Sequence, residues 1–173
     1  AAHTYPISAI LLRYFNPVGA HPSTAIGELP IGRPQNLVPA ITQTAIGLRE
    51  KLSVFGDDYP TTDGTAVRDY IHVVDLALGH VRAIEALNKQ GGLITVNLGT
   101  GVGTSVLQLL HAFEKACQKK IPYQIVERRS GDIAISFANA DLAKELMGWS
   151  AHMDVDQMCR DVWGWQSKNP QGY

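Results

Sequence analysis

The sequence predicts an α/β fold, and three features of its 173 residues indicate it. Short apolar runs that suit buried strands of a parallel sheet occur at 7–15, 52–55, 93–98 and 122–126. Apolar residues with helical spacing occur at 37–48, 74–87 and 106–117, and again near the end of the chain. Glycines, prolines and helix-capping residues separate these segments. Strands that alternate with helices in this way are typical of α/β proteins.

The first third of the chain is expected to form a strand, a long loop, a helix and a second strand. The apolar strand from Ile7 ends at Asn16, where Pro17 follows. Residues 18–35 contain many glycines and prolines, and loops of this length are usually functional or disordered. Asn36 is a good N-cap for the helix that follows, and 52–55 forms a short strand before Gly56.

The segment 62–76 is expected to be a polar loop that leads directly into a helix. It places Arg68 beside Asp69, and Asp75 is expected to cap or begin the helix. A guanidinium group matches phosphate oxygens in a two-pronged way, so Arg68 is a candidate phosphate ligand. A structural salt bridge with Asp69 or a helix end is the alternative interpretation.

Three later helices have recognisable starts or faces. In the helix 74–87, four apolar residues fall on overlapping faces, namely Leu76, Val81, Ile84 and Leu87. Ser105 with Gln108 forms a capping-box pattern at the start of 106–117. Asp154, with Gln157 three residues later, opens the last helix in the same way.

Gly99, Gly101 and Gly103 follow an apolar strand and resemble part of a dinucleotide-binding loop. The full G-x-G-x-x-G pattern needs a glycine where Thr104 stands, and no acidic residue follows about 20 residues later. We therefore favour a tight strand-to-helix turn over a cofactor site.

Composition limits the partners of the chain. The net charge is −1, which argues against nucleic acid and against a charged membrane surface. The longest apolar run, 7–12, is too short to span a bilayer. Cys117 and Cys159 lack metal-ligand spacing and are expected to be buried thiols, which favours a reducing, cytoplasmic location. No metal site is expected.

Two further places suit ligand contacts. Asn16 follows a strand directly, and the carboxyl ends of parallel strands are where α/β sheets bind ligands; a simple turn start is the alternative. Arg129 and Asp132 lie in one glycine-containing turn. The arginine suits a diphosphate and the aspartate suits a ribose hydroxyl, whereas an ordinary solvated turn is the alternative.

These segments together resemble the UDP-glucose 4-epimerase family of extended short-chain dehydrogenases/reductases. The resemblance runs from about Leu11 to Tyr173 and rests on three separated blocks, 13–21, 34–39 and 62–76. It implies the C-terminal nucleotide-sugar-binding half of such an enzyme. Residues 1–17 would end the N-terminal Rossmann domain and 18–173 would form the substrate domain, with strand 93–98 a candidate to join the Rossmann sheet.

The resemblance also implies roles for individual residues. Substrate contacts are implied at Asn16, Asn36, Leu37, Ser53, Phe55, Arg68, Arg129, Asp132 and Ser136. Tyr14 and Phe15 would lie on the nicotinamide side of NAD, and Phe55 would pack on uracil unless it is simply a core aromatic. Some family members have a bulky tyrosine where Ser136 stands, so we hypothesise that this serine leaves room for a 2-acetamido group.

The implied parent enzyme interconverts UDP-glucose and UDP-galactose with NAD, as a homodimer that binds the cofactor mainly through the N-terminal half. The family's catalytic pair is Tyr-x-x-x-Lys, and no tyrosine here has a lysine four residues later. No catalytic residue is therefore assigned, and the chain alone is predicted to be inactive. The alternatives are another nucleotide-sugar enzyme, such as a dehydratase or decarboxylase, and a non-catalytic UDP-sugar-binding module or split-protein half.

Overall fold

The computed structural model describes residues 7–30, 32 and 34–172, so the first six residues of the expected Rossmann segment lie outside the described part. The α/β class is confirmed. The elements in chain order are β1 (Ala9–Tyr14), β2 (Asn16–Val18), α1 (Leu37–Ala45), β3 (Leu52–Phe55), β4 (Val67–His72), α2 (Val73–Gln90), β5 (Leu93–Leu98), β6 (Gly103–Ser105), α3 (Val106–Cys117), β7 (Tyr123–Val126), β8 (Ile135–Ser136), α4 (Asp141–Met147) and α5 (Val155–Lys168).

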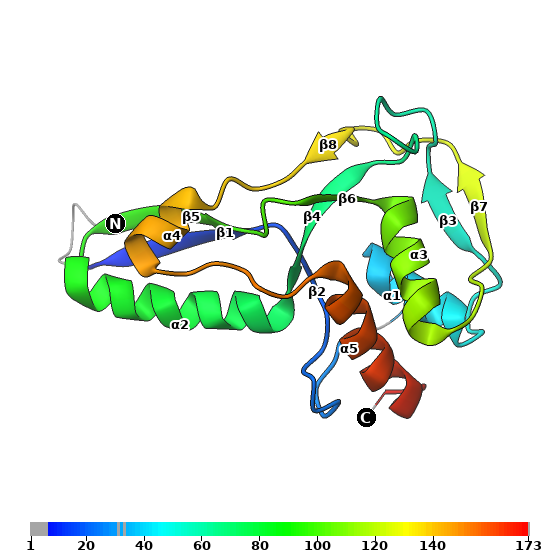
Figure 1. Cartoon of the computed structure of the whole chain (residues 1–173), viewed down its shortest axis with the longest axis horizontal. Helices are drawn as coiled ribbons and strands as arrows, with labels where there is room; N and C mark the ends of the chain where they lie inside the picture. The colour runs from blue at the N-terminus through cyan, green and yellow to red at the C-terminus, as the bar shows by residue number, and fades with distance from the viewer. Residues whose placement is uncertain (1–6, 31, 33, 173) are drawn as a thin grey trace.

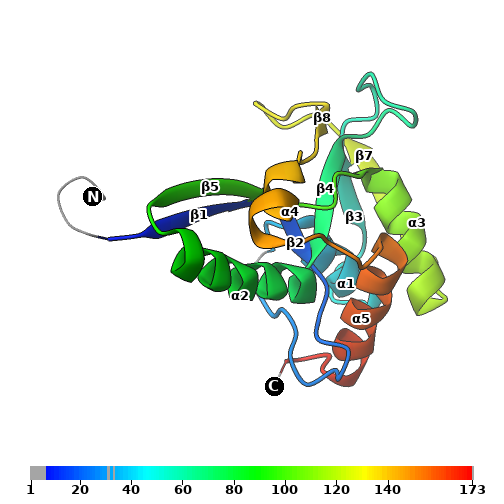
Figure 2. The same cartoon turned by 60° about the vertical axis from the view of Figure 1, so that its left-hand side comes forward.

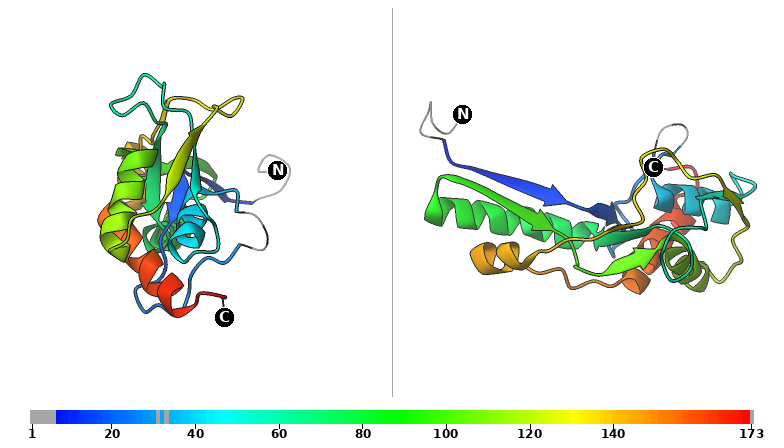
Figure 3. Two further views of the ribbon diagram at one scale, coloured as in Figure 1. Left: turned by 90° about the vertical axis from the view of Figure 1, so that its right-hand side faces the viewer. Right: turned by 90° about the horizontal axis from the view of Figure 1, so that it is seen from above.

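The chain is elongated and has two lobes (Figure 1). We call the part made of β1, β5, α2 and α4 the sheet lobe, and the part made of α1, α3, α5, β3 and β7 the pocket lobe. The strands β2, β4, β6 and β8 form a sheet that lies between the two lobes. The view from above shows the same extended arrangement (Figure 3).

In the sheet lobe, β1 and β5 pair in parallel, from Ala9 opposite Leu93 to Tyr14 opposite Leu98. The helices α2 and α4 pack on this pair and bury side chains that include Trp149. Within the described residues β1 pairs with no other strand, so its second edge is open. Leu11, in the middle of β1, keeps 47% of its surface exposed.

The predicted apolar faces of α2 are partly wrong. Leu76 is buried as expected, but Val81 and Ile84 are 53% and 62% exposed. A second apolar strip therefore runs along the side of α2 that faces away from β1 and β5. Helical spacing identified apolar residues correctly, but spacing does not show which side of a helix the rest of the chain covers.

The predicted loop before α2 is confirmed for residues 62–66 and wrong for residues 67–72, because Arg68 and Asp69 lie on the strand β4. This strand pairs in parallel with β2 and β8 and antiparallel with β6. All three partners are distant in sequence, and strand formation depends on such neighbours more than on local preference. Without these partner strands in view, the polar residues of β4 resemble a loop.

The predicted side-chain caps are present at two of four helix starts, and at α1 Asn36 holds the N-cap position but its side chain makes no capping hydrogen bond. The capping box of Ser105 and Gln108 is present, and the Asp154 side chain accepts a hydrogen bond from the Gln157 backbone N–H. The cap of α2 is His72 instead of Asp75, because His72 Nδ1 accepts from the backbone N–H of Val74. Asp75 lies in the first turn of α2 and accepts hydrogen bonds from the residues that lead into α5.

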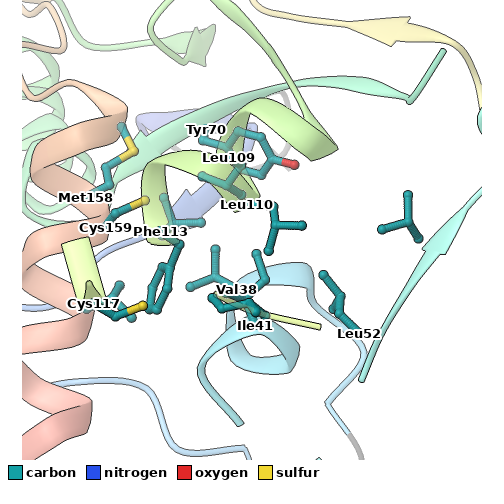
Figure 4. Packing of buried hydrophobic residues seen from close by; sticks show 14 residues of the cluster. Val38, Ile41, Leu52, Tyr70, Leu109, Leu110, Phe113, Cys117, Met158 and Cys159 are labelled. Atoms are coloured by element: carbon teal, nitrogen blue, oxygen red, sulfur yellow. The ribbon is translucent and has the colours of Figure 1, made fainter. Parts of the chain in front are cut away.

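The core of the pocket lobe lies between three helices (Figure 4). Phe113 of α3 packs between Ile41 of α1 and Met158 of α5, and each is almost fully buried. Cys117 and Cys159 are free, buried thiols, as predicted. Burial raises the pKa of the Cys159 thiol to about 12. Among the described residues, no helix combines the length and apolar character needed to cross a bilayer.

The last helix fastens the long loop near the start of the chain. The loop 19–30 runs beside α5 (Figure 2). A Cβ at Gly27 would lie 2.1 Å from the Trp165 ring, so the loop backbone packs directly on the indole. Lys168 Nζ donates to Thr24 Oγ1 at 2.8 Å, and Asp161 accepts from the fully buried His72 at 3.1 Å.

Candidate functional site

A cavity of about 560 Å³ opens between α1, β3 and the central sheet. Polar and apolar walls both contribute to it, as in sites that hold a small ligand by a few directed contacts. The cavity brings together residues from six separate parts of the chain, namely 16–18, 34–40, 49–55, 66–70, Val106 and Arg129. Seven of the residues predicted to bind substrate line it, namely Asn16, Asn36, Leu37, Ser53, Phe55, Arg68 and Arg129.

Two arginines of this set converge on one carboxylate. Arg68 Nη2 lies 3.7 Å from Asp132 Oδ1, and Arg129 Nε donates to Asp132 Oδ2 at 2.9 Å. The Arg68 guanidinium also donates to the backbone carbonyl of Ile133 at 2.8 Å, which fixes its plane. An anion is therefore already accommodated between the two cations, and phosphate oxygens have the same charge and acceptor character.

A flat aromatic wall adjoins these cations. Ser53 and Phe55 point to one face of β3, while Leu52 and Val54 point to the core. The Arg129 guanidinium carbon lies 4.8 Å from the centre of the Phe55 ring. An aromatic ring of this kind can stack with a nucleotide base, since every base has a π-face.

Arg128 holds the turn that carries Arg129. Its Nε donates to Asp58 Oδ1 at 2.5 Å, and its guanidinium lies 3.9 Å over the Tyr59 ring. A Cβ at Gly56 would lie 2.6 Å from Arg128 Cγ, so this close packing requires the glycine. Arg128 is thus occupied with protein groups, and its neighbour Arg129 is the one that faces the cavity.

The glycine turn after β5 binds a side chain of the protein itself. Asp69 is fully buried, and its carboxylate accepts from Thr100 N and Gly101 N at 2.9 Å each and from Ala138 N at 3.1 Å. The backbone N–H groups that would face a phosphate in a dinucleotide loop are therefore already satisfied. The predicted tight turn is present, but it joins β5 to the strand β6, which begins at Gly103, and does not lead directly into the helix α3.

Asn36 and Asn16 occupy edges of the cavity. Asn36 is at the N-cap position of α1, but its side chain makes no capping hydrogen bond. It hydrogen-bonds to Glu28 instead. Burial raises the pKa of the Glu28 carboxyl, and the hydrogen bond to Asn36 offsets this only in part. Asn16 is exposed at the start of β2, opposite Tyr70 of β4.

Four predicted site residues do not line the cavity. Asp132 contacts it only through the two arginines, and Ser136 lies on β8 beside Arg68. Tyr14, at the end of β1, is 53% exposed, and its ring lies 6.4 Å from that of His80. Phe15 is half-buried next to it. The two residues assigned to the cofactor are therefore at the margin between the lobes.

Sequence reasoning missed Arg49 and Tyr70, which both line the cavity. Burial raises the pKa of Tyr70 to about 12, despite the opposing charge of Arg68. A lone arginine in a turn carries no local signal of function, whereas Tyr70 could have been noticed from its position two residues after Arg68. Within the described part of the chain, no group of His, Cys, Asp and Glu residues is arranged to hold a metal ion.

Comparison with known proteins gives consistent matches. Residues 1–162 match the family model described as GDP-mannose 4,6 dehydratase. The chain is 60% identical to UDP-glucose 4-epimerase of Mus musculus over 166 residues. This aligned region covers 96% of this chain and 48% of that enzyme. The structure of UDP-glucose-4-epimerase from Stenotrophomonas maltophila with bound NAD and formylated UDP-arabinopyranose superposes with a TM-score of 0.94 at 56% identity, over 97% of this chain and 50% of that one.

A second solved structure gives the same result. UDP-glucose 4-epimerase from Bifidobacterium longum in complex with NAD+ and UDP has a TM-score of 0.92 at 51% identity, over 96% of this chain and 49% of that one. The chain thus spans about half the length of the relatives that it matches. The matched part is their C-terminal half.

Proposed function

Because this chain belongs to the GDP-mannose 4,6 dehydratase family, we propose that it is the UDP-sugar-binding portion of an enzyme that interconverts UDP-glucose and UDP-galactose. Its identity of 60% to a UDP-glucose 4-epimerase supports epimerase chemistry over a dehydratase or decarboxylase within the family. One observation carries the proposal. Arg68 and Arg129 converge on one anion-sized position beside the Phe55 ring.

In this proposal the nucleotide lies along the cavity. Uracil stacks on Phe55, and the two arginines bind the diphosphate. Asp132 then exchanges its ion pairs for hydrogen bonds from a ribose hydroxyl, while Asn16, Asn36, Leu37 and Ser53 supply further contacts along the cavity wall. Firm binding of the non-reacting nucleotide positions the sugar, which is the part that reacts.

The N-terminal Rossmann half is the proposed partner of the sheet lobe. The open edge of β1 and the exposed Leu11 suit a neighbouring strand and a covering helix, since parallel sheets are normally buried on both faces. In this arrangement residues 1–17 and β5 continue the Rossmann sheet and 18–173 contribute the substrate domain. The assembled enzyme is proposed to be a cytoplasmic homodimer, which accords with the free thiols of Cys117 and Cys159.

NAD would be held mainly by that N-terminal half and would supply the hydride acceptor for C4 of the sugar. The residues present fit the assignment of NAD to the N-terminal half, because Asp69 occupies the backbone N–H groups of the glycine turn, which cannot then hold a diphosphate. Tyr14 and Phe15 lie at the carboxyl end of β1, where they can contact the nicotinamide side of the site. The described residues provide no Tyr-x-x-x-Lys pair, so we expect no turnover by this chain alone.

The second candidate is a non-catalytic UDP-sugar-binding module or one half of a split protein. It is favoured by the observation that the chain spans about half of its relatives. The two proposals differ in one measurement. Epimerase activity that appears only when the N-terminal half and NAD are added supports the enzyme, whereas UDP-sugar binding without activity in that mixture supports the module.

Calorimetric titration of the full chain with UDP tests the binding site that both proposals share. We expect the double variant Arg68→Ala, Arg129→Ala to bind UDP at least about 100-fold more weakly, because each charged hydrogen-bonding group contributes about 1.5–3 kcal/mol. Arg82→Ala is the matched control, since Arg82 pairs with Glu85 on the exposed side of α2. Unchanged UDP affinity in the double variant would overturn the proposal.

A further inference from the structure

The hydrophobic cores of the two lobes meet at the end of β4. Tyr70 belongs to the core of the pocket lobe, and the next residue, Ile71, belongs to the core of the sheet lobe. His72 ends the strand and caps α2, and its side chain is fully buried. The contacts of His72 are therefore in the place where one lobe is oriented relative to the other.

The hydrogen bonds of the His72 ring have a fixed direction. Nδ1 accepts from the backbone N–H of Val74, so the ring proton lies on Nε2. Nε2 then donates to Asp161 Oδ2 at 3.1 Å. A Cβ at Gly19 would lie 2.9 Å from Nε2, so a side chain at that position would displace the ring from Asp161. The surrounding backbone thus holds the ring against one carboxylate.

That carboxylate belongs to the pocket lobe. Asp161 lies on α5, and both of its oxygens accept from Gln157 Nε2 at 2.9 Å. Met158 and Val162 of the same helix are part of the core of the pocket lobe. The hydrogen bond from His72 to Asp161 therefore connects the start of α2 to a helix that is fixed within the other lobe.

A second carboxylate connects α5 to the start of α2. Asp75, in the first turn of α2, accepts from the backbone N–H groups of His152 and Met153 at 2.9 and 2.8 Å. These two residues precede α5, whereas Asp161 lies in the middle of it. Two separate attachments fix the angle of a helix, whereas a single attachment leaves it free to pivot. Loss of the hydrogen bond from His72 would leave the attachment at Asp75.

We propose that the hydrogen bond between His72 and Asp161 is a positioning contact that holds the bound UDP-sugar at the correct distance from the cofactor. This inference rests on the function proposed above. The nucleotide binds in the cavity of the pocket lobe, whereas Tyr14 and Phe15 contact the cofactor at the margin of the sheet lobe. A change in the orientation of the lobes alters the distance between the sugar and the cofactor, and a misplacement of about 1 Å can slow a reaction about 100-fold.

A contact that only stabilises the fold is the competing role, and kinetics separate the two. Loss of folded protein lowers turnover and UDP binding together. Loss of a positioning contact lowers kcat and leaves the Kd for UDP unchanged, because the cavity stays intact within its own lobe.

The test uses variants that break the contact from either side. His72→Asn keeps an acceptor for the backbone N–H of Val74, but its side chain is too short to reach Asp161. Asp161→Ala removes the acceptor, and Asp161→Asn keeps one for His72 Nε2. Asp156→Ala is the matched control, because it removes a carboxylate of α5 that pairs with the exposed Lys115. Thermal unfolding of each variant checks that it is folded.

The first measurement is the activity of the enzyme assembled from both halves with NAD. We expect His72→Asn and Asp161→Ala to lower kcat about 10-fold and to change the Kd for UDP by less than about 2-fold. Asp161→Asn should keep most of the turnover, and Asp156→Ala should keep all of it. Equal losses of kcat and UDP affinity, or an unchanged kcat, would overturn the inference.

The second measurement is independent of activity. Spin labels at Arg82→Cys on α2 and His111→Cys on α3, which are both exposed, report the distance between the lobes by pulsed electron paramagnetic resonance of the full chain. We expect a broader or shifted distance distribution when His72→Asn or Asp161→Ala is added, and no change with Asp156→Ala. An unchanged distribution in all variants would contradict the inference, and so would a failure of both His72→Asn and Asp161→Ala to fold. If the unchanged enzyme has no turnover, the proposed function fails, and this distance alone decides whether the contact fixes the lobes.

Discussion

The two lobes differ in how completely the chain covers its own apolar surface. In the pocket lobe, Phe113 is almost fully buried between helices, and Trp165 is almost fully buried beneath the loop that carries Gly27. In the sheet lobe, Leu11 on β1 and Val81 and Ile84 on α2 remain exposed, although the strands there have the apolar character of a sheet buried on both faces. The pocket lobe therefore buries its own apolar side chains. The sheet lobe has the composition of a sheet that is covered on both faces, but this chain leaves part of its apolar surface exposed.

The proposed function assigns binding and catalysis to different parts of the molecule. The candidate cavity and its three arginines belong to the pocket lobe and the central sheet. The residues assigned to the cofactor, Tyr14 and Phe15, belong to the end of β1 in the lobe that is open. Under this proposal, a ligand that contacts only the cavity binds to this chain alone, whereas the reaction at the cofactor also requires the N-terminal half.

Truncation of one apolar residue in each lobe should give the largest difference. We expect Phe113→Ala to lower the free energy of unfolding by about 3–5 kcal/mol, because it leaves a cavity in a closed core. Ile84→Ser should change it by less than about 0.5 kcal/mol, because the side chain already faces solvent. Urea unfolding of the full chain measures both. Similar losses in the two variants would contradict the comparison.

The contact between the lobes can be weakened through Asp69. This carboxylate joins β4 to the turn after β5 and to the segment before α4. Asp69→Asn places an amide N–H₂ against backbone N–H donors, and we expect a loss of roughly 2–3 kcal/mol in unfolding free energy. Asp57→Asn, at an exposed site, is the control. If the two variants are equally stable, the turn does not depend on the charge.

Ser136 tests the sugar end of the site. We expect Ser136→Tyr to weaken the binding of UDP-N-acetylglucosamine about 10-fold more than that of UDP-glucose, because the larger ring fills the space for a 2-acetamido group. Titration of the enzyme assembled from both halves measures the two affinities. Equal refusal of UDP-N-acetylglucosamine with serine and with tyrosine would count against this role.

A smaller effect should appear in the dependence of stability on pH. Burial acts to raise the pKa of Asp63, but hydrogen bonds from Ser105 and Thr65 outweigh it and lower the pKa overall. The folded-state pKa is thus below the unfolded one, so the contribution is complete above about pH 4 and is lost as the pH falls through the folded value. Asp63→Asn should flatten the acid limb of a stability curve, and an unchanged slope would contradict this.

The sequence predicted those elements whose bounds depend on residues close together in the chain. The capping box of Ser105 and Gln108 gave the start of α3, and the apolar run 93–98 gave the bounds of β5. Short sequence motifs also predicted most of the residues of the candidate site. Seven of its predicted residues line one cavity because their motifs flank the elements that enclose it.

Non-local features were not predictable from the sequence. Arg68 was assigned to a loop because the three strands that pair with β4 are distant in the chain. The exposure of Val81 was missed because helical spacing does not show whether a partner covers a second face. Arg49 was missed because a lone arginine in a turn carries no local signal, and its place in the cavity wall is known only from the structure.

The attachment of α5 to the loop 19–30 has a consequence for synthesis of the protein. Gly27 packs on Trp165, and Thr24 accepts from Lys168, so the loop that leads to Asn36 is fastened by residues near the opposite end of the chain. Because translation proceeds from the N-terminus, this loop has no helix to pack on until α5 has emerged from the ribosome. A nascent chain stalled before Trp165 would lack both of these contacts.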